Sequence, residues 1–347
     1  MKTQKLKLFI LTFSTVFLGS CTKLLYTSLD VLRPAEVTFA PTANRLLIVN
    51  NTVIQPSDIG HRSQKINEKP KVVLLRNDSL ALFCLGALTE ELESRNFFST
   101  VQLASKSVNP SFNFQTIKPL DSTMVVDLCR SSNANVILSL DKIKVSDDIT
   151  EYFLNESSEY LNVFEVRYES TWSIHYPNKV QASTIQFKDT IFWDAQSYYR
   201  QNALNMLPRR TDGIIDGALN VGKKSINRFL PYWTKADRYF YMYSNKYLKK
   251  GMDSIYVKNW KSAINLWDKA SRSRNTLVQA YAANNIAVAY EILGEIDKAI
   301  ESAANAYYLL GKSASTDGNA FFNLYSYIQE LSTRKKEILL LKKQVGQ

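Results

Sequence analysis

VFEVRYESTWSIHY, residues 163–176, alternates apolar with polar side chains at nearly every position. The apolar members share one side of an extended chain: Phe164, Val166, Tyr168, Trp172, Ile174 and Tyr176. The charged and polar members share the other side: Glu165, Arg167, Glu169 and His175. Because the side chains of a strand point alternately to its two faces, this stretch predicts a long strand with one buried face. The turn sequence Pro177-Asn178-Lys179 follows, so residues 180–193 are expected to return as the partner strand of a β-hairpin.

Shorter strand and helix patterns alternate upstream of this hairpin, and one helix is expected after it. The strands are expected at residues 45–51, 98–103 and 135–145, and the helices at 80–97, 120–131 and 211–229. The polar residues 55–69 are expected to form a loop. The β-α-β-α-β order followed by a hairpin predicts an α/β, sandwich-like domain over residues 35–235.

Two segments of this domain carry a resemblance to known lipoproteins. ALTEELESRNFF at residues 87–98 reads as a helix end, and SSNANVILSL at residues 131–140 reads as a step from helix to strand. Together with the apolar strand before them, they resemble the α/β domain of penicillin-binding-protein activator lipoproteins, the curli secretion lipoprotein and the amino-terminal domain of TolB. The resemblance covers about residues 35–230. Because those domains act by contacting other proteins, it implies protein binding and carries over no catalytic residue.

The last third of the chain, residues 236–347, is rich in Ala, Leu, Lys and Tyr and predicts an all-α domain. Within residues 280–311, small, aromatic and turn-forming residues stand at the positions typical of a tetratricopeptide repeat: Ala287, Tyr290, Gly294, Ala299 and Ala306. An earlier copy carries Ala263, Trp267 and Ala270, and Ala263 precedes Ala299 by 36 residues (299 − 263). The alternative is an unrelated helical hairpin with alanine-rich packing.

Two repeats cannot bury both of their ends, so neighbouring segments are expected to act as caps. The aromatic bridge at residues 237–243 and a final helix at residues 320–343 are the candidates. Tetratricopeptide arrays present a concave groove to peptides and proteins. The resemblance therefore implies a short groove that binds other proteins of the cell envelope.

The amino terminus has the organisation of a secretory signal peptide. Residues 1–7 carry three lysines, and residues 8–18 are an apolar run too short to cross a bilayer, which needs about 20 residues. Leu18-Gly19-Ser20-Cys21 resembles the lipobox of bacterial lipoproteins, which implies cleavage after residue 20, a palmitate-type acyl chain on Cys21 and a membrane anchor. The alternative is an ordinary signal peptide with an incidental cysteine. Residues 21–34 are expected to be a tether.

The residues after Cys21 bear on where the anchored protein would reside. Thr22 and Lys23 follow it, and the first acidic residue is Asp30. Inner-membrane retention signals and surface-export signals of such lipoproteins carry acidic residues near the cysteine. The expected location is therefore the outer membrane, facing the periplasm.

The net charge of +11 falls to +8 (11 − 3) once the three lysines of the leader are removed. These charges are spread along the chain without the basic and aromatic interleaving of a nucleic-acid reader, so no nucleic-acid partner is expected. Hydrophobic residues make up 45% of the chain, enough to bury two ordinary cores.

Residue patterns for catalysis are weak. His61 lies in a polar loop and His175 on the polar side of a strand, so both are expected to be solvated. Cys84 and Cys129 either pair as a disulfide or remain buried thiols. GALNVGK at residues 217–223 matches a phosphate loop by letter, but it lies in a predicted helix and lacks the following Ser or Thr. No catalytic residue, cofactor, metal site or small-molecule substrate is expected.

These patterns together indicate a lipid-anchored, non-enzymatic scaffold or regulator that binds proteins of an envelope complex. A structural subunit of an outer-membrane secretion or export assembly is the alternative, suggested by the curli-type resemblance. A hydrolase of cell-wall glycan is a third hypothesis, and it lacks a nominated pair of carboxylates.

Overall fold

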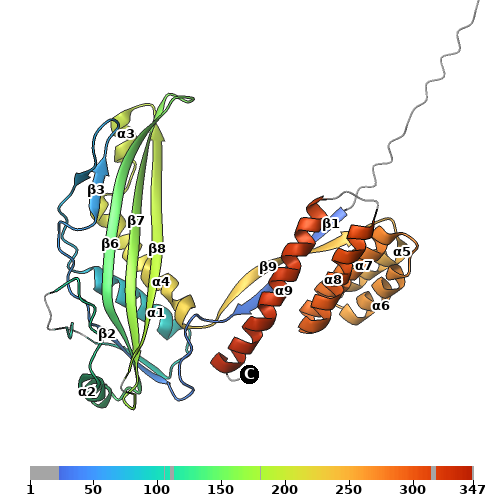
Figure 1. The fold of residues 1–347 in the computed structure, drawn as a ribbon, viewed down its shortest axis with the longest axis horizontal. Coiled ribbons are helices and arrows are strands. Elements are labelled where there is room, and N and C mark those ends of the chain that lie inside the picture. The colour runs from blue at the N-terminus through green and yellow to red at the C-terminus, as the bar shows by residue number, and fades with distance from the viewer. Residues whose placement is uncertain (1–22, 105, 110–112, 180, 314–317, 346–347) are drawn as a thin grey trace, which may run out of the picture. The chain divides into compact units, whose positions relative to one another are not determined.

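The computed structural model describes residues 23–104, 106–109, 113–179, 181–313 and 318–345, and its fold is α+β (Figure 1). The chain divides into two compact units. The first, here called the α/β unit, is Pro34–Tyr232 with the last few residues of the chain. The second, the helical unit, combines the strand at residues 23–33 with Trp233–Lys342. The Cys21 prediction lies outside the described residues.

One seven-stranded sheet forms the centre of the α/β unit. Its strands are β2 (Arg45–Asn50), β3 (His61–Gln64), β4 (Lys71–Val72), β5 (Thr100–Leu103), β6 (Val136–Leu154), β7 (Glu159–His175) and β8 (Ser183–Ser197). The long β6 pairs antiparallel with β7 along one edge, and along its other edge it pairs in parallel with β2 and then with β3. β8 continues the sheet beyond β7.

The predicted hairpin is confirmed as the pair β7 and β8. Phe164, Val166 and Trp172 are fully buried on the face predicted to be apolar. The loop expected at residues 55–69 is wrong in part, since it contains β3. β3 is short and polar, and its pairing with β6, some 86 residues away at His61 and Asp147, leaves little signal in the local sequence.

Helices cover both faces of this sheet. They are α1 (Leu80–Ser94), α2 (Ser122–Ser132), α3 (Arg200–Asn205) and α4 (Arg210–Phe229). α1 and α4 pack on the face that carries Leu46 and Ile48, whereas α2 packs on the opposite face, beside Leu47 and Val49 (Figure 1). Cys84 belongs to α1 and Cys129 to α2, so the sheet separates the two thiols and both are free.

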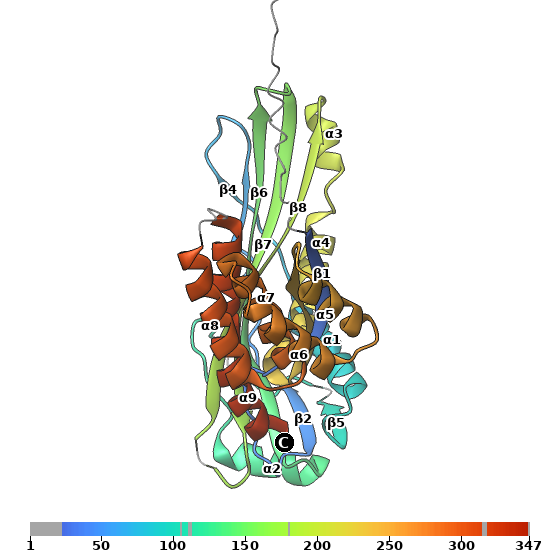
Figure 2. The same ribbon diagram turned by 90° about the vertical axis from the view of Figure 1, so that its right-hand side faces the viewer.

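The helical unit is built from consecutive helices that pack against their neighbours (Figure 2). They are α5 (Lys246–Tyr256), α6 (Trp260–Ser271), α7 (Thr276–Ile292), α8 (Ile296–Lys312) and α9 (Gly318–Val345). The small residues predicted to allow close helix packing are fully buried: Ala263, Ala270, Ala287, Ala299 and Ala306. Gly294 ends the turn between α7 and α8 with φ +78°, a conformation that glycine adopts at little cost.

Two strands correct the prediction that this unit is all-α. The expected tether is β1 (Lys23–Arg33), and the expected aromatic bridge is part of β9 (Tyr232–Met242). They form a two-stranded sheet within the helical unit. The pairing is antiparallel, because Tyr26 contacts Tyr239 while Asp30 contacts Lys235. Among the described helices, none combines the length and apolar character that a membrane crossing requires.

Candidate binding site in the helical unit

Side chains of α7 hold strand β9 by its backbone. Asn285 of α7 accepts a hydrogen bond from the Tyr241 backbone N–H (2.8 Å) and donates one to the carbonyl oxygen of the same residue (3.0 Å). Asn284 donates to the Tyr239 carbonyl oxygen (2.9 Å). Two adjacent asparagines thus hold a strand by its backbone, and that strand belongs to the chain itself.

Aromatic stacking also stabilises the position of β9. The rings of Tyr241 and Tyr281 are parallel to within 2° at a centroid distance of 4.4 Å, and Phe240 stacks on Trp267 at 5.5 Å. Phe240, Tyr241 and Trp267 are all at least 98% buried. Displacing β9 from the helices would expose this core, so β9 is an integral part of the helical unit.

A buried guanidinium joins β9 to two helices. Arg238 contacts both oxygens of Glu291 on α7 (2.6 and 2.7 Å) and both oxygens of Glu330 on α9 (3.0 Å each). Burial alone would lower the pKa of Arg238, but the two carboxylates more than offset this and raise it. The guanidinium is therefore permanently charged, and its charge is compensated inside the protein.

The network extends to β1 and to a tyrosine. Arg33 contacts Glu330 (3.1 Å) and Glu337 (2.8 Å), and Tyr327 donates to Glu291 (2.8 Å). Burial, followed by the charge of Glu291, raises the pKa of Tyr327 well above its ordinary value. The phenol consequently stays protonated and acts as a hydrogen-bond donor.

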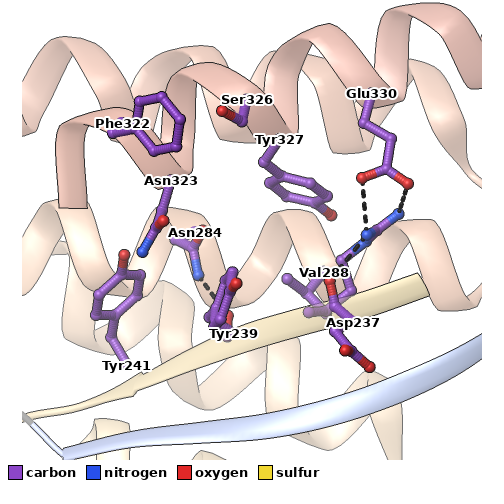
Figure 3. Close-up of a pocket in the computed structure, with 11 residues that line it drawn as sticks. Asp237, Tyr239, Tyr241, Asn284, Val288, Phe322, Asn323, Ser326, Tyr327 and Glu330 are labelled. Atoms are coloured by element: carbon purple, nitrogen blue, oxygen red, sulfur yellow. Dashed lines mark hydrogen bonds and ion pairs between the residues drawn. The ribbon is translucent and has the colours of Figure 1, made fainter. Parts of the chain in front are cut away.

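An open cavity of about 190 Å³ remains between β9, α7 and α9 (Figure 3). Its walls include Tyr239, Tyr241 and Tyr327, and Phe322 with Asn323 lies at the α9 side. Two charged residues of its lining, Arg238 and Glu330, are paired with each other. The cavity is lined by aromatic rings and by the amide side chains of Asn284 and Asn323.

The two histidines are buried, contrary to prediction. His61 Nδ1 bonds to an oxygen of Asp147, and Arg210 lies 2.9 Å from the other oxygen as an ion pair without hydrogen-bond geometry. Asn77 lies within 3.2 Å of His61 Nε2. This cluster joins β3 and the segment before α1 to β6 and α4.

The second histidine belongs to a cluster that contains the residue types of a catalytic triad. Ser139 Oγ lies 2.9 Å from His175 Nε2 and 2.8 Å from Asp141 Oδ1. A relay needs the carboxylate on the far nitrogen of the histidine, whereas here Asp141 contacts the serine. Burial lowers the pKa of His175, with Asp141 acting in the opposite direction. The three side chains are less than 5% exposed, so the arrangement is a buried polar network.

The described residues contain no cluster of His, Cys, Asp and Glu that could hold a metal ion. GALNVGK lies inside α4, as predicted. The glycines serve packing, because a Cβ on Gly217 would lie 2.5 Å from the Tyr168 hydroxyl and one on Gly222 would lie 2.2 Å from the Cys84 carbonyl oxygen.

Comparison with known proteins gives a family for the first unit. A family model described as "Domain of unknown function (DUF8603)" matches residues 43–241, more than half of the chain. The chain belongs to the DUF8603 family. A second model, "Domain of unknown function (DUF6340)", matches residues 249–333, from α5 into α9. The DUF8603 match spans the α/β unit and ends on β9, at Tyr241.

Two solved structures are distantly similar to this DUF8603 protein. An uncharacterised protein is 13% identical, with 55% of this chain and 94% of that chain covered and a TM-score of 0.24. A protein described as a neuraminyllactose-binding hemagglutinin homolog from Helicobacter pylori is 9% identical, with 56% and 90% covered and a TM-score of 0.27. No curated protein matches the chain.

The predicted repeat residues and the observed site lie in the same unit but do different things. Ala263, Ala270, Ala287, Ala299 and Ala306 pack helices together, and Trp267 supports β9. Tyr290 is half-buried beneath the ammonium group of Lys298. Sequence analysis missed Arg238, Asn285, Glu291 and Tyr327. The adjacent asparagines inside an alanine-rich helix were the signal that could have indicated a backbone-binding position.

Proposed function

We propose that this DUF8603 protein is a membrane-anchored periplasmic lipoprotein that works as a non-enzymatic scaffold for envelope proteins. The proposal rests on the sequence Leu18-Gly19-Ser20-Cys21 and on the strand that follows it. β1 begins at Lys23, two residues after Cys21. It is part of the helical unit, to which Arg33 is tied through Glu330 and Glu337.

This placement of β1 is the observation that carries the proposal. An acyl chain on Cys21 would hold the helical unit directly at the bilayer, and the α/β unit would be connected to the anchor through β1 of that unit. If residues 21–34 were a flexible tether, as the sequence alone suggests, the α/β unit would instead be the first folded part after the anchor. An anchor joined to a strand restricts how the protein can turn on the membrane, which suits a scaffold that presents one surface.

The surface proposed for partner binding is the open cavity and its aromatic rim. Partner contact would fall on Phe322 of α9, which lines the cavity and is 71% exposed, with Asn323 and Tyr327 beside it in the cavity wall. Exposed aromatic side chains beside a cavity are typical of protein-binding surfaces.

Anchoring is tested on the mature amino terminus of the purified protein. Mass spectrometry should find residue 21 as the first residue, carrying a diacylglyceryl group and an amide-linked acyl chain. Cys21→Ala should abolish both the modification and membrane association, whereas Cys129→Ala should change neither. An uncut leader or an unmodified Cys21 would overturn the anchored part of the proposal.

Partner binding is tested by crosslinking in intact cells with a photoreactive residue at position 322. We expect a discrete crosslinked envelope protein. The control is the same residue at Val257, which is 75% exposed on the same unit but lies outside the rim. Equal crosslinking from both positions, or none from position 322, would count against the rim as the binding surface.

A further inference from the structure

Strand β8 forms one complete edge of the seven-stranded sheet. It pairs with β7 along its whole length, from Ser183 to Ser197, and no other described strand pairs with it (Figure 1). The opposite edge of the sheet is divided between the short strands β4 and β5. β8 is therefore the longest open edge among the described strands.

The backbone of this edge has few partners. Among the described residues, one hydrogen bond reaches it from outside the β7 and β8 pair, from Arg228 to the Lys188 carbonyl oxygen at 3.4 Å. This contact indicates that the backbone groups of Lys188 point away from β7. By alternation, those of Thr190, Phe192 and Asp194 do so too. An open row of N–H and C=O groups is a template for another strand.

The side chains of the same residues are available for cross-strand contacts. Trp172 of β7 faces α4 and pairs with Ile185, so the odd-numbered residues of β8 share the helix-covered face. Lys188, Thr190, Phe192 and Asp194 lie on the other face, and all four are exposed. Phe192 is 65% exposed, an unusual position for a phenylalanine.

We propose that β8 pairs antiparallel with β8 of a second copy of this chain, about a two-fold axis at Ile191. This register places Lys188 opposite Asp194 of the other copy, and Thr190 opposite Phe192. The symmetry repeats each pair, giving two opposite-charge pairs and two pairs of an aromatic with a β-branched residue. Pairs of both types stabilise neighbouring strands.

The neighbouring registers lack this complementarity. An axis at Thr190 places Lys188 opposite Phe192 and Gln186 opposite Asp194. An axis at Phe192 places Lys188 opposite Gln196 and Thr190 opposite Asp194. Charged residues on an edge strand ordinarily discourage pairing, and here they match in one register only. An isologous contact of this kind closes on itself, so it yields a dimer and no fibre.

Charge reversal tests the register on the purified full-length protein, with molecular mass followed over a concentration series. The native protein should form a dimer. Lys188→Asp or Asp194→Lys replaces two attractive pairs by two repulsive ones and should raise the dimer dissociation constant at least about fivefold. The double variant Lys188→Asp/Asp194→Lys should restore it. Lys144→Asp, on β6 and away from the edge, is the matched control.

Cysteine crosslinking tests the same contact independently of binding strength. Ile191→Cys faces its own copy across the axis, at a Cα separation of about 4.5–5.5 Å that a disulfide can bridge. It should crosslink on mild oxidation, whereas Thr184→Cys on the same strand and the native protein should not. A monomer at every concentration up to roughly 100 μM, or crosslinking equal at both positions, would overturn the proposal. So would a dimer that both single charge reversals leave unchanged.

Discussion

The side chain of Arg238 joins a strand to two helices through four hydrogen bonds, and it is 3% exposed. A charge buried in this way is tolerable only while its partners remain. Removing the guanidinium leaves the buried carboxylate of Glu291 without a counter-charge, while Glu330, which is 33% exposed, keeps Arg33 as a partner. The energetic importance of this residue therefore lies in the cost of breaking the network.

Arg238→Met should destabilise the helical unit by about 3–5 kcal/mol, because the buried carboxylate of Glu291 loses its counter-charge. Urea unfolding followed by the far-ultraviolet signal of the helices measures the change. Arg272→Met is the control, since Arg272 is 75% exposed and pairs with Asp268 one helical turn away. That variant should change stability by less than about 0.5 kcal/mol. Similar losses in both variants would refute this interpretation.

The thiol of Cys84 should be unreactive in the native protein. Burial raises its pKa to about 12, with a smaller contribution from Asp189, and only the thiolate reacts with alkylating reagents. We expect Cys84 to resist iodoacetamide at pH 8 and to react rapidly after unfolding in urea, as read by peptide mass spectrometry. Fast labelling of the folded protein would contradict the buried position.

The same shift sets a direction for alkaline stability. The native pKa lies above the ordinary value of 9.0, so the contribution of Cys84 is complete below pH 9 and is lost as the pH rises toward 12. Cys84→Ala should remove this part of the alkaline destabilisation of the α/β unit. The comparison is made on the slope of stability against pH, since the substitution also leaves a small cavity.

Residues with a packing role were predictable from the sequence, whereas residues with a buried charge were not. The packing role of Ala287 follows from its small side chain, and the turn role of Gly294 follows from its backbone freedom. Arg238 and Glu291 look like surface residues until each is seen beside the other, 53 positions away. The error on His61 has the same origin, because its partner Asp147 is 86 positions distant.

Helix α4 packs closely on the hairpin, because its glycines admit aromatic side chains. Gly217 lies over Tyr168, whose hydroxyl donates to the Ile214 carbonyl oxygen of the same helix. Gly213 lies over Phe164 in the same way. The long hairpin and α4 can thus pack closely because α4 has glycine, with no side chain, where the aromatic rings contact it.

Gly217→Ala should destabilise the α/β unit by about 1–3 kcal/mol, because the new methyl group overlaps a fully packed ring. Gly86→Ala is the matched control in α1, where an added Cβ meets no atom within 4 Å. This control should gain about 0.5–1 kcal/mol from reduced backbone freedom. Thermal unfolding of the two variants and of the native protein measures both changes in stability. A gain in both would show that α4 can move away from β7.

The elements that sequence analysis predicted are those with a strong local pattern. A single stretch of sequence contains the whole pattern that predicts each of them, as for the β7 and β8 hairpin, α1 and α4. β1, β3 and β9 were missed as strands because each is defined by a partner far along the sequence. The short α3 was missed as well, since six residues are too few for a periodicity.

For the whole molecule, membership of β1 in the helical unit makes a prediction about amide exchange. Residues 24–33 should be protected against hydrogen exchange as strongly as β9 and should lose protection together with it on mild destabilisation. Arg33→Gln should weaken that protection, because Arg33 ties β1 to α9. Exchange measured by mass spectrometry tests both. Immediate exchange throughout residues 24–33 would instead support the prediction of a flexible tether.

The pairing of β1 with β9, and the contact of Arg33 with Glu337 across 304 positions, also bear on synthesis. The ribosome makes β1 well before β9 and α9, so residues 34–232 can fold while β1 still lacks its neighbours. A chain that stops before α9 leaves Arg33 without its carboxylates and β9 without its cover. Segments made far apart in time thus complete one structure together, and we expect a chain that lacks α9 to be cleaved more readily by proteases.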